Sequence, residues 1–138
     1  MILLDTNVLS ALMQQAPDAR VVSWLDQQPR SLIWTTSVTV LEVRFGLQIM
    51  PSGKRRQALS EKFDTLLDKL EQRIAPFDVA AAREASDLMA SRRKAGRPVE
   101  NRDTMIAGIA LAQHASLATR KLADFADTRV PLVNPWSA

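Results

Sequence analysis

The chain of 138 residues contains no cysteine and only one histidine. Without cysteine, a disulfide framework and a thiolate metal site are both excluded. A single histidine argues against a ribonuclease that uses a histidine pair as general acid and base. We expect this residue, His114, to lie at the end of a helix, where a cation is favoured. The lack of cysteine also suits the cytoplasm, where we expect the protein to reside.

Long apolar runs are missing as well. No run approaches the roughly 20 residues of a membrane span, and we expect no membrane association. The apolar N-terminal stretch has no basic segment before it and is interrupted by Asp5 and Asn7, so it is a poor signal peptide. A hydrophobic fraction of 46% and a charged fraction of 24% are ordinary for a globular protein. We expect one domain over residues 1–138. The net charge of +3 permits a polyanionic partner.

Hydrophobic patterns predict strands that alternate with helices. The predicted strands cover residues 2–4, 32–36, 74–77, 116–119 and 130–133. The predicted helices cover residues 18–27, 38–50, 54–71, 78–94 and 99–113. We expect Ser37 and Asp78 to cap two of these helices, and Gly96 to end one.

This alternation predicts an α/β protein, a parallel sheet with helices on both faces. Such sheets bind ligands beyond the carboxyl ends of their strands. Asp5 directly follows the first, wholly apolar strand. It therefore falls where a functional residue is expected.

Three further acids follow strands or begin the helices after them. Glu42 lies one turn into the helix after the second strand, among apolar residues of the helical wheel; alone, it is as well explained as a rim acid paired with a cation. Asp103 lies near the start of a helix, where an acid also suits the helix dipole. Asp124 follows the fourth strand and could simply cap a turn. Glu100 points to a similar side as Asp103 and is either an outer acid or solvated.

Taken together, these four acids predict a metal centre. Carboxylate oxygens without cysteine or a nearby histidine suit Mg²⁺, or Mn²⁺, rather than Zn²⁺. The chemistry that such a centre performs best is hydrolysis of phosphodiester bonds by an activated water. We therefore expect Asp5, Glu42 and Asp103 to converge within reach of one metal ion.

Five segments in order carry a family resemblance, from Met1 to Trp136: MILLDTNVLSALM, TTSVTVLEVRFGL, NRDTMIAGIALA, LATRKLADF and VNPW. The sequence resembles a PIN-domain ribonuclease, and more narrowly the VapC and FitB toxins of type II toxin–antitoxin pairs. The resemblance implies a single-domain α/β/α sandwich with a five-stranded parallel sheet. It also implies Mg²⁺-dependent cleavage of RNA.

The same resemblance implies site residues and partners. It assigns catalysis and metal binding to Asp5, Glu42 and Asp103, with a fourth acid in the TRKLADF loop, and supporting roles to Asn7 and Thr119. The implied partners are an RNA substrate, a small VapB- or FitA-like antitoxin, and a second copy of the chain in a homodimer. DNA would be contacted only through the antitoxin.

The sequence departs from the family pattern at Lys121. The family usually has Asn or Asp after TR, and a lysine cannot bind Mg²⁺. Either Asp124 supplies the fourth ligand or that ligand is missing. Lys121 would then grip a substrate phosphate or weaken metal binding by repulsion.

Two other functions stay open. Asp5 could be the nucleophile of a phosphatase, although such enzymes usually have a second Asp where this chain has Asn7. Alternatively, the chain is a catalytically impaired PIN-like binding module, as Lys121 suggests. A covalent aspartyl-phosphate intermediate would reveal the phosphatase. Metal titration and an RNA cleavage assay would separate the binding module from the nuclease.

Aromatic and basic residues elsewhere have more ordinary explanations. We expect the three tryptophans, Trp24, Trp34 and Trp136, to serve in packing rather than in base stacking. The basic run 54–56 is expected to be a solvated helix face. A second basic cluster precedes the helix of Asp103 and is a candidate for contact with RNA phosphates; its members are Arg92, Arg93, Lys94 and Arg97.

Overall fold

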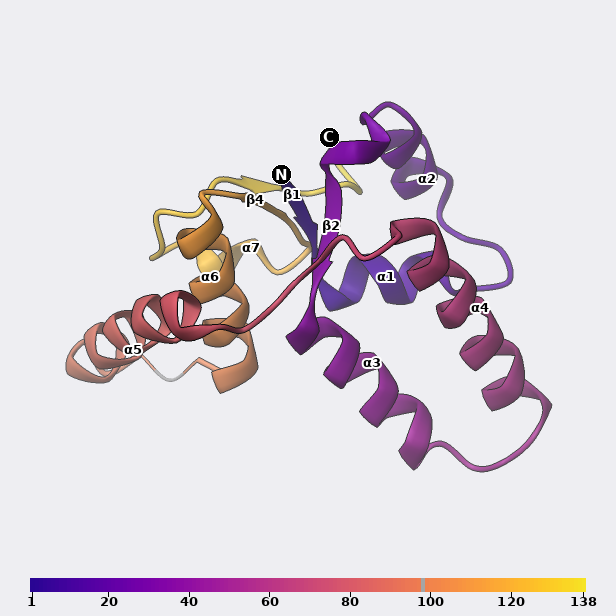
Figure 1. Cartoon of the computed structure of the whole chain (residues 1–138), viewed down its shortest axis with the longest axis horizontal. Helices are drawn as coiled ribbons and strands as arrows, with labels where there is room; N and C mark the ends of the chain where they lie inside the picture. Colours follow the sequence, from indigo (N-terminus) through magenta and orange to yellow (C-terminus); the bar gives the residue numbers. More distant parts are fainter. Residues whose placement is uncertain (98) are drawn as a thin grey trace.

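The computed structural model describes residues 1–97 and 99–138. In chain order, the helices and strands of these residues are β1 (Ile2–Leu4), α1 (Thr6–Leu12), α2 (Ala19–Asp26), the short 3₁₀ helix η1 (Arg30–Leu32), β2 (Ile33–Thr36), α3 (Ser37–Ile49), α4 (Lys54–Leu70), β3 (Ile74–Ala75), α5 (Val79–Lys94), α6 (Asn101–Gln113), β4 (Ser116–Ala118), α7 (Leu122–Phe125) and β5 (Leu132–Val133) (Figure 1).

The strands form one sheet in the order β3-β2-β1-β4-β5, and every neighbouring pair is parallel. The predicted α/β fold with a five-stranded parallel sheet is confirmed. β1 lies in the centre, so its carboxyl end is flanked by those of β2 and β4. Residues that follow these three strands are therefore brought to one edge of the sheet.

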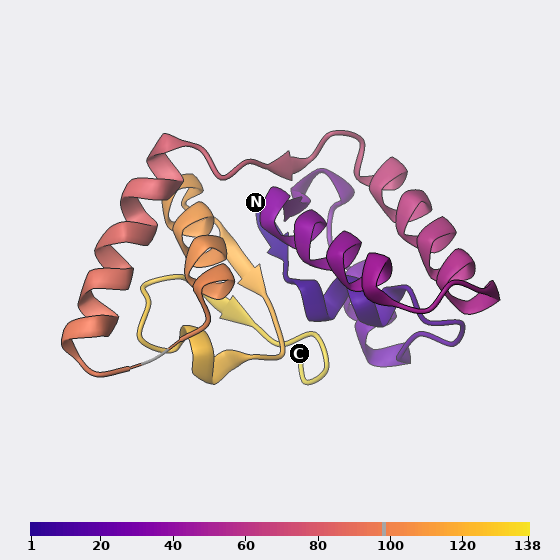
Figure 2. The ribbon, with the colours of Figure 1, turned by 90° about the horizontal axis from the view of Figure 1, so that it is seen from below.

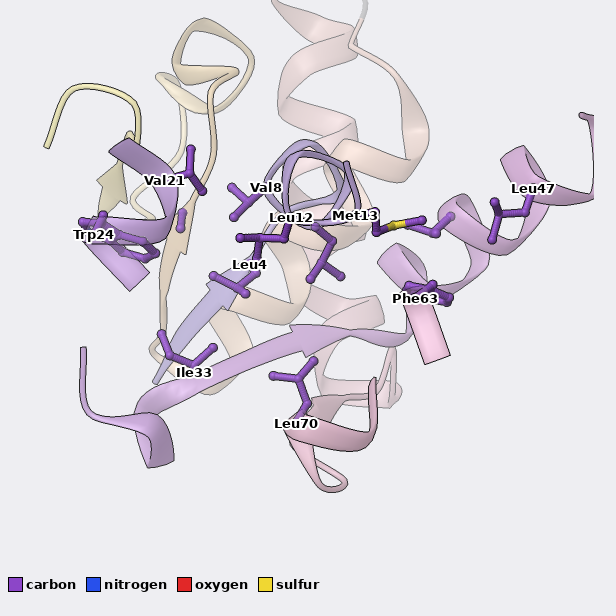
Figure 3. Close-up of a cluster of buried hydrophobic side chains, with 13 residues drawn as sticks. Leu4, Val8, Leu12, Met13, Val21, Trp24, Ile33, Leu47, Phe63 and Leu70 are labelled. Carbon is purple, nitrogen blue, oxygen red and sulfur yellow. The ribbon is translucent and has the colours of Figure 1, made fainter. Parts of the chain in front are cut away.

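Helices cover both faces of the sheet and build two hydrophobic cores. Helices α1 to α4 contribute to one core, which is drawn in Figure 3, whereas α5, α6 and α7 contribute to the other. Figure 2 shows α5 and α6 side by side on one side of the sheet, with α3 and α4 on the opposite side. Leu4 belongs to the first core and Leu3 to the second, because successive residues of a strand face opposite sides. This explains why β1 is apolar at every position.

Two helices at the functional edge were not predicted from the sequence. Helix α1 begins directly after Asp5, whose side chain accepts a hydrogen bond from the Thr6 amide and caps it. Helix α7 is four residues long. Neither is long enough to show a clear helical period.

The start of α3 differs from the prediction. Its N-cap is Thr36, whose side chain accepts from the Thr39 amide at 3.0 Å. Ser37, the predicted cap, is the first helical residue, and its hydroxyl accepts from the Phe77 amide at 3.1 Å. Either of these two successive hydroxyl residues could cap the helix. Thr36 does so, whereas the hydroxyl of Ser37 is engaged by the Phe77 amide.

The boundaries near the second basic cluster also differ. The helix predicted for residues 99–113 begins at Asn101, with Glu100 as its N-cap. Pro98, which directly precedes the predicted helix, lies outside the described residues. Helix α5 begins and ends as predicted. Asp78 caps its start, and Gly96, at φ +66°, follows its end. His114 is the C-cap of α6, as predicted.

The tryptophans pack as expected. Trp24 is buried in the first core, Trp136 packs against that core, and Trp34 packs against the second. No helix of the described residues is long and apolar enough to cross a membrane.

Candidate active site

Asp5 is the most enclosed acid at the carboxyl edge of the sheet, with 1% of its surface exposed. Its Oδ1 accepts a hydrogen bond from the Thr6 amide at 2.8 Å, and its Oδ2 accepts from Thr119 Oγ1 at 2.7 Å and from Asn7 Nδ2 at 3.2 Å. Burial raises the pKa of Asp5, and these hydrogen bonds partly oppose that rise. Both residues that the resemblance assigned to support, Asn7 and Thr119, thus contact this carboxylate and hold its orientation.

Glu42 reaches the same edge from α3. Its Oε1 accepts from Thr6 Oγ1 at 2.9 Å, and its Oε2 lies 3.9 Å from Arg102 Nε. Thr6 therefore bridges Asp5 and Glu42: its amide binds the first and its hydroxyl binds the second. We did not single out Thr6 from the sequence, although it lies in the DTN segment beside Asp5.

The environment of Glu42 differs from the predicted one. Of its predicted neighbours on the helical wheel, Val38 is buried, whereas Leu41, Phe45 and Ile49 are 55%, 53% and 67% exposed. Glu42 therefore does not sit on a buried apolar stripe. The stripe faces away from the core, whereas the side chain of Glu42, 14% exposed, turns to Thr6 and Arg102.

Asp103 enters from the first turn of α6 and is 2% exposed. Its Oδ2 lies 3.4 Å from Lys121 Nζ. Burial raises the pKa of Asp103 to about 6; Lys121 opposes this rise, and the charge of Asp5 adds to it. Glu100 is the N-cap of α6 and accepts from the Asp103 amide at 3.3 Å. Its other oxygen is engaged by Arg102 Nε at 2.9 Å.

Lys121 holds the positive charge of this acidic site. Burial alone would lower the pKa of Lys121, but the charges of Asp103, Asp5 and Glu42 outweigh that effect and raise it. The ammonium group is thus within electrostatic reach of all three predicted acids. The side chain of Lys121 is 48% exposed, so the ammonium group can leave Asp103 and turn to solvent.

Asp124 lies on α7, in the loop that follows β4. It is half-buried, and its backbone carbonyl accepts from Arg92 Nη2 at 2.7 Å. A role for Asp124 as the fourth acid stays a prediction.

Mg²⁺ and Mn²⁺ prefer oxygen ligands such as carboxylates. Asp5 and Asp103 are buried carboxylates with raised pKa values, and a divalent cation would relieve the cost of holding their charges. Hard oxygen donors of this kind fit Mg²⁺ and Mn²⁺. Within residues 1–97 and 99–138, however, no three acidic or histidine side chains are arranged so that they could hold a metal ion. Joint binding of one ion by Asp5, Glu42 and Asp103 therefore stays a prediction.

Arg92 does not have the predicted role in RNA contact. Its side chain is 3% exposed and is used entirely within the protein. Nε and Nη2 bind the two carboxylate oxygens of Asp127, each at 2.9 Å, and Nη1 donates to Thr104 Oγ1 at 2.8 Å. Together with the bond to the Asp124 carbonyl, these contacts tie α5, α6 and the α7 loop to one another. Arg92 is a structural clamp.

The other three residues of the basic cluster differ in their surroundings. Arg97 donates from Nη2 to the Ala123 carbonyl, and its Nε lies 3.7 Å from Asp127 Oδ2, so it also braces the α7 loop. Arg93 and Lys94 are exposed. Contact of these two residues with RNA stays a prediction.

Comparison with known proteins identifies the family. Residues 2–129 match the model of the PIN domain. The chain is 39% identical to the plasmid stability protein StbB of Pseudomonas syringae pv. tomato over 139 residues, covering all of both chains. It is also 39% identical to the VapC ribonuclease Y4jK of Sinorhizobium fredii over 137 residues, which are 99% of this chain and 98% of the relative. The chain belongs to the PIN-domain family.

A solved structure agrees with this assignment. The crystal structure of FitAcB from Neisseria gonorrhoeae superposes with a TM-score of 0.90 and 32% sequence identity, covering all of both chains. The resemblance to PIN-domain toxins of the VapC and FitB kind, first drawn from five short segments, is confirmed.

Proposed function

We propose that this protein is the toxin of a type II toxin–antitoxin pair and a Mg²⁺-dependent endoribonuclease. One observation carries the proposal: at the carboxyl edge of the sheet, Thr6 bridges Asp5 and Glu42, and Lys121 contacts Asp103. Its support is membership in the PIN-domain family and full-length similarity to a VapC ribonuclease. The protein would act on cellular RNA in the cytoplasm.

Each residue of the site has a role in this proposal. Asp5, Glu42 and Asp103 would hold Mg²⁺ or Mn²⁺, with Asp124 as the fourth acid. When bound, such an ion would supply an activated water and neutralise charge on the leaving oxygen. Asn7 and Thr119 orient Asp5, and Thr6 keeps Glu42 beside it. Lys121 is placed to bind a phosphate oxygen of the RNA once its contact with Asp103 is exchanged.

The test is cleavage of a fluorescently labelled RNA by the purified protein in Mg²⁺ and in EDTA. Asp5→Asn and Asp103→Asn should each lower the rate by about 10²–10³-fold, because loss of one charged catalytic group commonly costs that much. Asp87→Asn, an exposed acid on α5, serves as the control and should retain the wild-type rate. Full activity of Asp5→Asn, or cleavage that persists in EDTA, would contradict the proposal.

The impaired binding module is the second candidate, because Lys121 contacts Asp103 at 3.4 Å. It predicts weakened metal binding and no cleavage of any RNA. A phosphatase with Asp5 as nucleophile is disfavoured, since both oxygens of Asp5 accept hydrogen bonds and Asn7 occupies the place of the second acid. A covalent aspartyl-phosphate would nevertheless identify it.

We further propose that a small VapB- or FitA-like antitoxin binds this protein and blocks the site. An apolar groove of about 420 Å³ lies between α2 and α4 and is lined by Val22, Leu25, Ile33 and Leu66. Four cations border it: Arg30, Lys62, Lys69 and Arg73. An amphipathic helix with acidic flanks would match this groove. A basic side chain of the same partner, entering among the acids, would compete with metal.

Cleavage by the purified pair is the test of this second role. The pair should cut RNA far more slowly than the toxin alone. The double variant Lys62→Glu/Lys69→Glu should weaken the complex, because like charges would then meet at the groove, whereas Lys54→Glu, an exposed cation at the start of α4, should not. Equal cleavage by the pair and by the toxin alone would refute the inhibitory role. Contact with DNA through the antitoxin stays a prediction.

A further inference from the structure

A hollow of about 650 Å³ opens beside the acidic site. Three of its lining residues, Thr6, Glu42 and Lys121, belong to the candidate active site. Two others, Arg120 and Trp136, have no role in the proposed chemistry. One hollow is thus shared by the acidic site and a pair of planar side chains.

Arg120 and Trp136 form a cation–π stack. The guanidinium carbon of Arg120 lies 4.8 Å from the centroid of the Trp136 ring. Trp136 is half-buried and packs against the first core, and its amide donates to Asn134 Oδ1 at 3.0 Å. The exposed guanidinium of Arg120 is therefore supported by a tryptophan ring that packing holds in place. Trp136 does pack as predicted, but it also carries an exposed cation.

The stack is tied to the acidic site through Asn7. Asn7 Oδ1 accepts from the Arg120 amide at 3.0 Å, while its Nδ2 donates to Asp5 Oδ2 at 3.2 Å. A single side chain thus joins the backbone of the stack to the most buried acid. A nucleotide that follows a phosphate held at the acids would reach the stack.

The charge of Arg120 is not cancelled by contact. Among the described residues, no acidic group lies within 4 Å of its guanidinium. Asp18, which also lines the hollow, pairs instead with Arg20 at 2.8 Å. Arg120 and Lys121 are the two cations of the lining, and both would attract the phosphates of an RNA backbone and repel a basic peptide.

We infer that the Arg120–Trp136 stack is a platform for the RNA base next to the cleaved phosphodiester. The base stacks on the outer face of the guanidinium plane, and Trp136 holds that plane in place. Every base has a π-face, so the platform positions single-stranded RNA without selecting one base. This inference rests on the proposed function, since it takes RNA as the substrate.

The experiment measures stacking without cleavage. Six-nucleotide single-stranded RNAs, with 2-aminopurine at each position in turn, are titrated with full-length protein in EDTA. Wild type should bind these RNAs and quench the probe. Arg120→Ala should weaken binding about tenfold and remove the quenching, because stacking of one base is worth about 1–3 kcal/mol. Arg120→Lys keeps the charge without the plane, so it should recover part of the affinity and none of the quenching.

The matched control is Arg55→Ala, an exposed arginine of α4, which should change affinity less than twofold. Equal losses in Arg55→Ala and Arg120→Ala would overturn the inference, because they indicate general attraction by charge. Quenching that survives in Arg120→Lys and Arg120→Ala would overturn it as well. If wild type binds penta-arginine but no RNA, and Arg120→Ala changes neither result, the hollow is a site for a basic peptide.

This test is independent of the test for nuclease activity. Cleavage in Mg²⁺ is measured separately on the same proteins. A protein that binds and quenches but never cuts would refute the proposed nuclease and leave the platform standing. A protein that cuts RNA without Arg120-dependent quenching would refute the platform alone.

Discussion

Lys121 places an ammonium group among three carboxylates that come from β1, α3 and α6. Asp103 is its direct contact, at 3.4 Å, and Asp5 and Glu42 add to the charge that it balances. An internal cation of this kind stabilises acids that burial would otherwise protonate. In the proposed site it would also compete with a divalent ion for the same charges. The residue that departs from the family pattern would therefore control how strongly such a site binds metal.

Substitutions at Lys121 and Asp124 separate two explanations of the fourth acid. If Asp124 is that acid, Asp124→Asn should lower Mg²⁺-dependent cleavage about 10²–10³-fold. Lys121→Asn should then have a smaller effect on the rate and should raise Mn²⁺ affinity in calorimetric titration, because repulsion is removed. Cleavage of one RNA at fixed ionic strength measures the first effect.

The opposite explanation makes Lys121 the occupant of a missing ligand position. It predicts a nearly inert wild-type protein, no further loss in Asp124→Asn, and a large gain in Lys121→Asp. If Asp124→Asn keeps the rate of an active wild type, the site has only three acids.

Asp103 should make stability depend on pH. Burial raises its pKa from 3.8 to about 6, so between these values the folded state binds more protons than the unfolded state. The free energy of unfolding of the metal-free protein should therefore fall as pH rises from about 4 to about 6. Urea unfolding in EDTA measures this slope, which should be smaller in Asp103→Asn. An identical slope in both proteins would show that the pKa of Asp103 is not raised.

Helices α5 and α6 approach each other closely at Gly108. A Cβ atom built there would lie 2.6 Å from the Ala81 carbonyl oxygen and 2.8 Å from Ala85 Cβ. The backbone oxygen cannot move aside easily, so glycine is required by packing rather than by its dihedral angles. This contact sets the position of α6, and hence of Asp103 on its first turn.

Gly108→Ala should therefore lower the free energy of unfolding by about 1–3 kcal/mol, the usual cost of overpacking. Gly46→Ala is the control, because nothing lies within 4 Å of a Cβ at that position of α3. It should raise stability by about 0.5–1 kcal/mol, since alanine favours helix more than glycine does. Urea unfolding compares the two proteins. The explanation fails if both substitutions stabilise.

The Arg92 clamp should be a second determinant of stability at this scale. Arg92→Met removes four hydrogen bonds. It leaves Asp127, whose side chain is 26% exposed, with only the longer contact to Arg97 Nε at 3.7 Å. We expect a loss of about 3 kcal/mol in the free energy of unfolding, at the low end for a broken buried pair because Asp127 retains some solvent. Arg93→Met, one residue along and exposed, should stay within about 0.5 kcal/mol of wild type. Similar losses in both variants would contradict the clamp.

At the scale of the whole molecule, the surface divides into faces of different character. The apolar groove with its basic border lies on the side of α2 and α4, and the acidic site and its hollow lie at the carboxyl edge of the sheet. Along α3, Leu41, Phe45 and Ile49 form an exposed apolar stripe at a spacing of four residues. Such a stripe on one helix is self-complementary about a two-fold axis, which suits the predicted homodimer.

Light scattering at micromolar concentration tests the homodimer. Wild type should have twice the mass of one chain, and Phe45→Ser should shift it toward the monomer because the centre of the stripe is lost. Met89→Ser changes an apolar residue of α5 that is 43% exposed and should remain dimeric. A monomeric wild type, or dissociation in Met89→Ser alone, would rule out an interface on α3.

The sequence by itself determined the fold class and most of its elements. Residues 2–4 and the period of residues 54–71 specify a buried strand and an amphipathic helix, because side-chain periodicity reports which face is buried. The acid after the first strand also predicted the edge at which the candidate site lies, since parallel strands bring their carboxyl ends together. Local order along the chain is sufficient for these inferences.

Only the tertiary structure decided which side chains meet. Thr6 binds Glu42 across 36 positions, Arg92 binds Asp127 across 35, and Arg120 binds Asn7 across 113. No local pattern distinguishes the buried Arg92 from the exposed Arg93, because their surroundings are supplied by α6 and α7 rather than by their own helix. Contacts of this kind depend on packing between distant segments. For that reason the sequence was sufficient to predict the family of the protein. The roles of Lys121, Arg92 and Arg120 could be seen only in the folded structure.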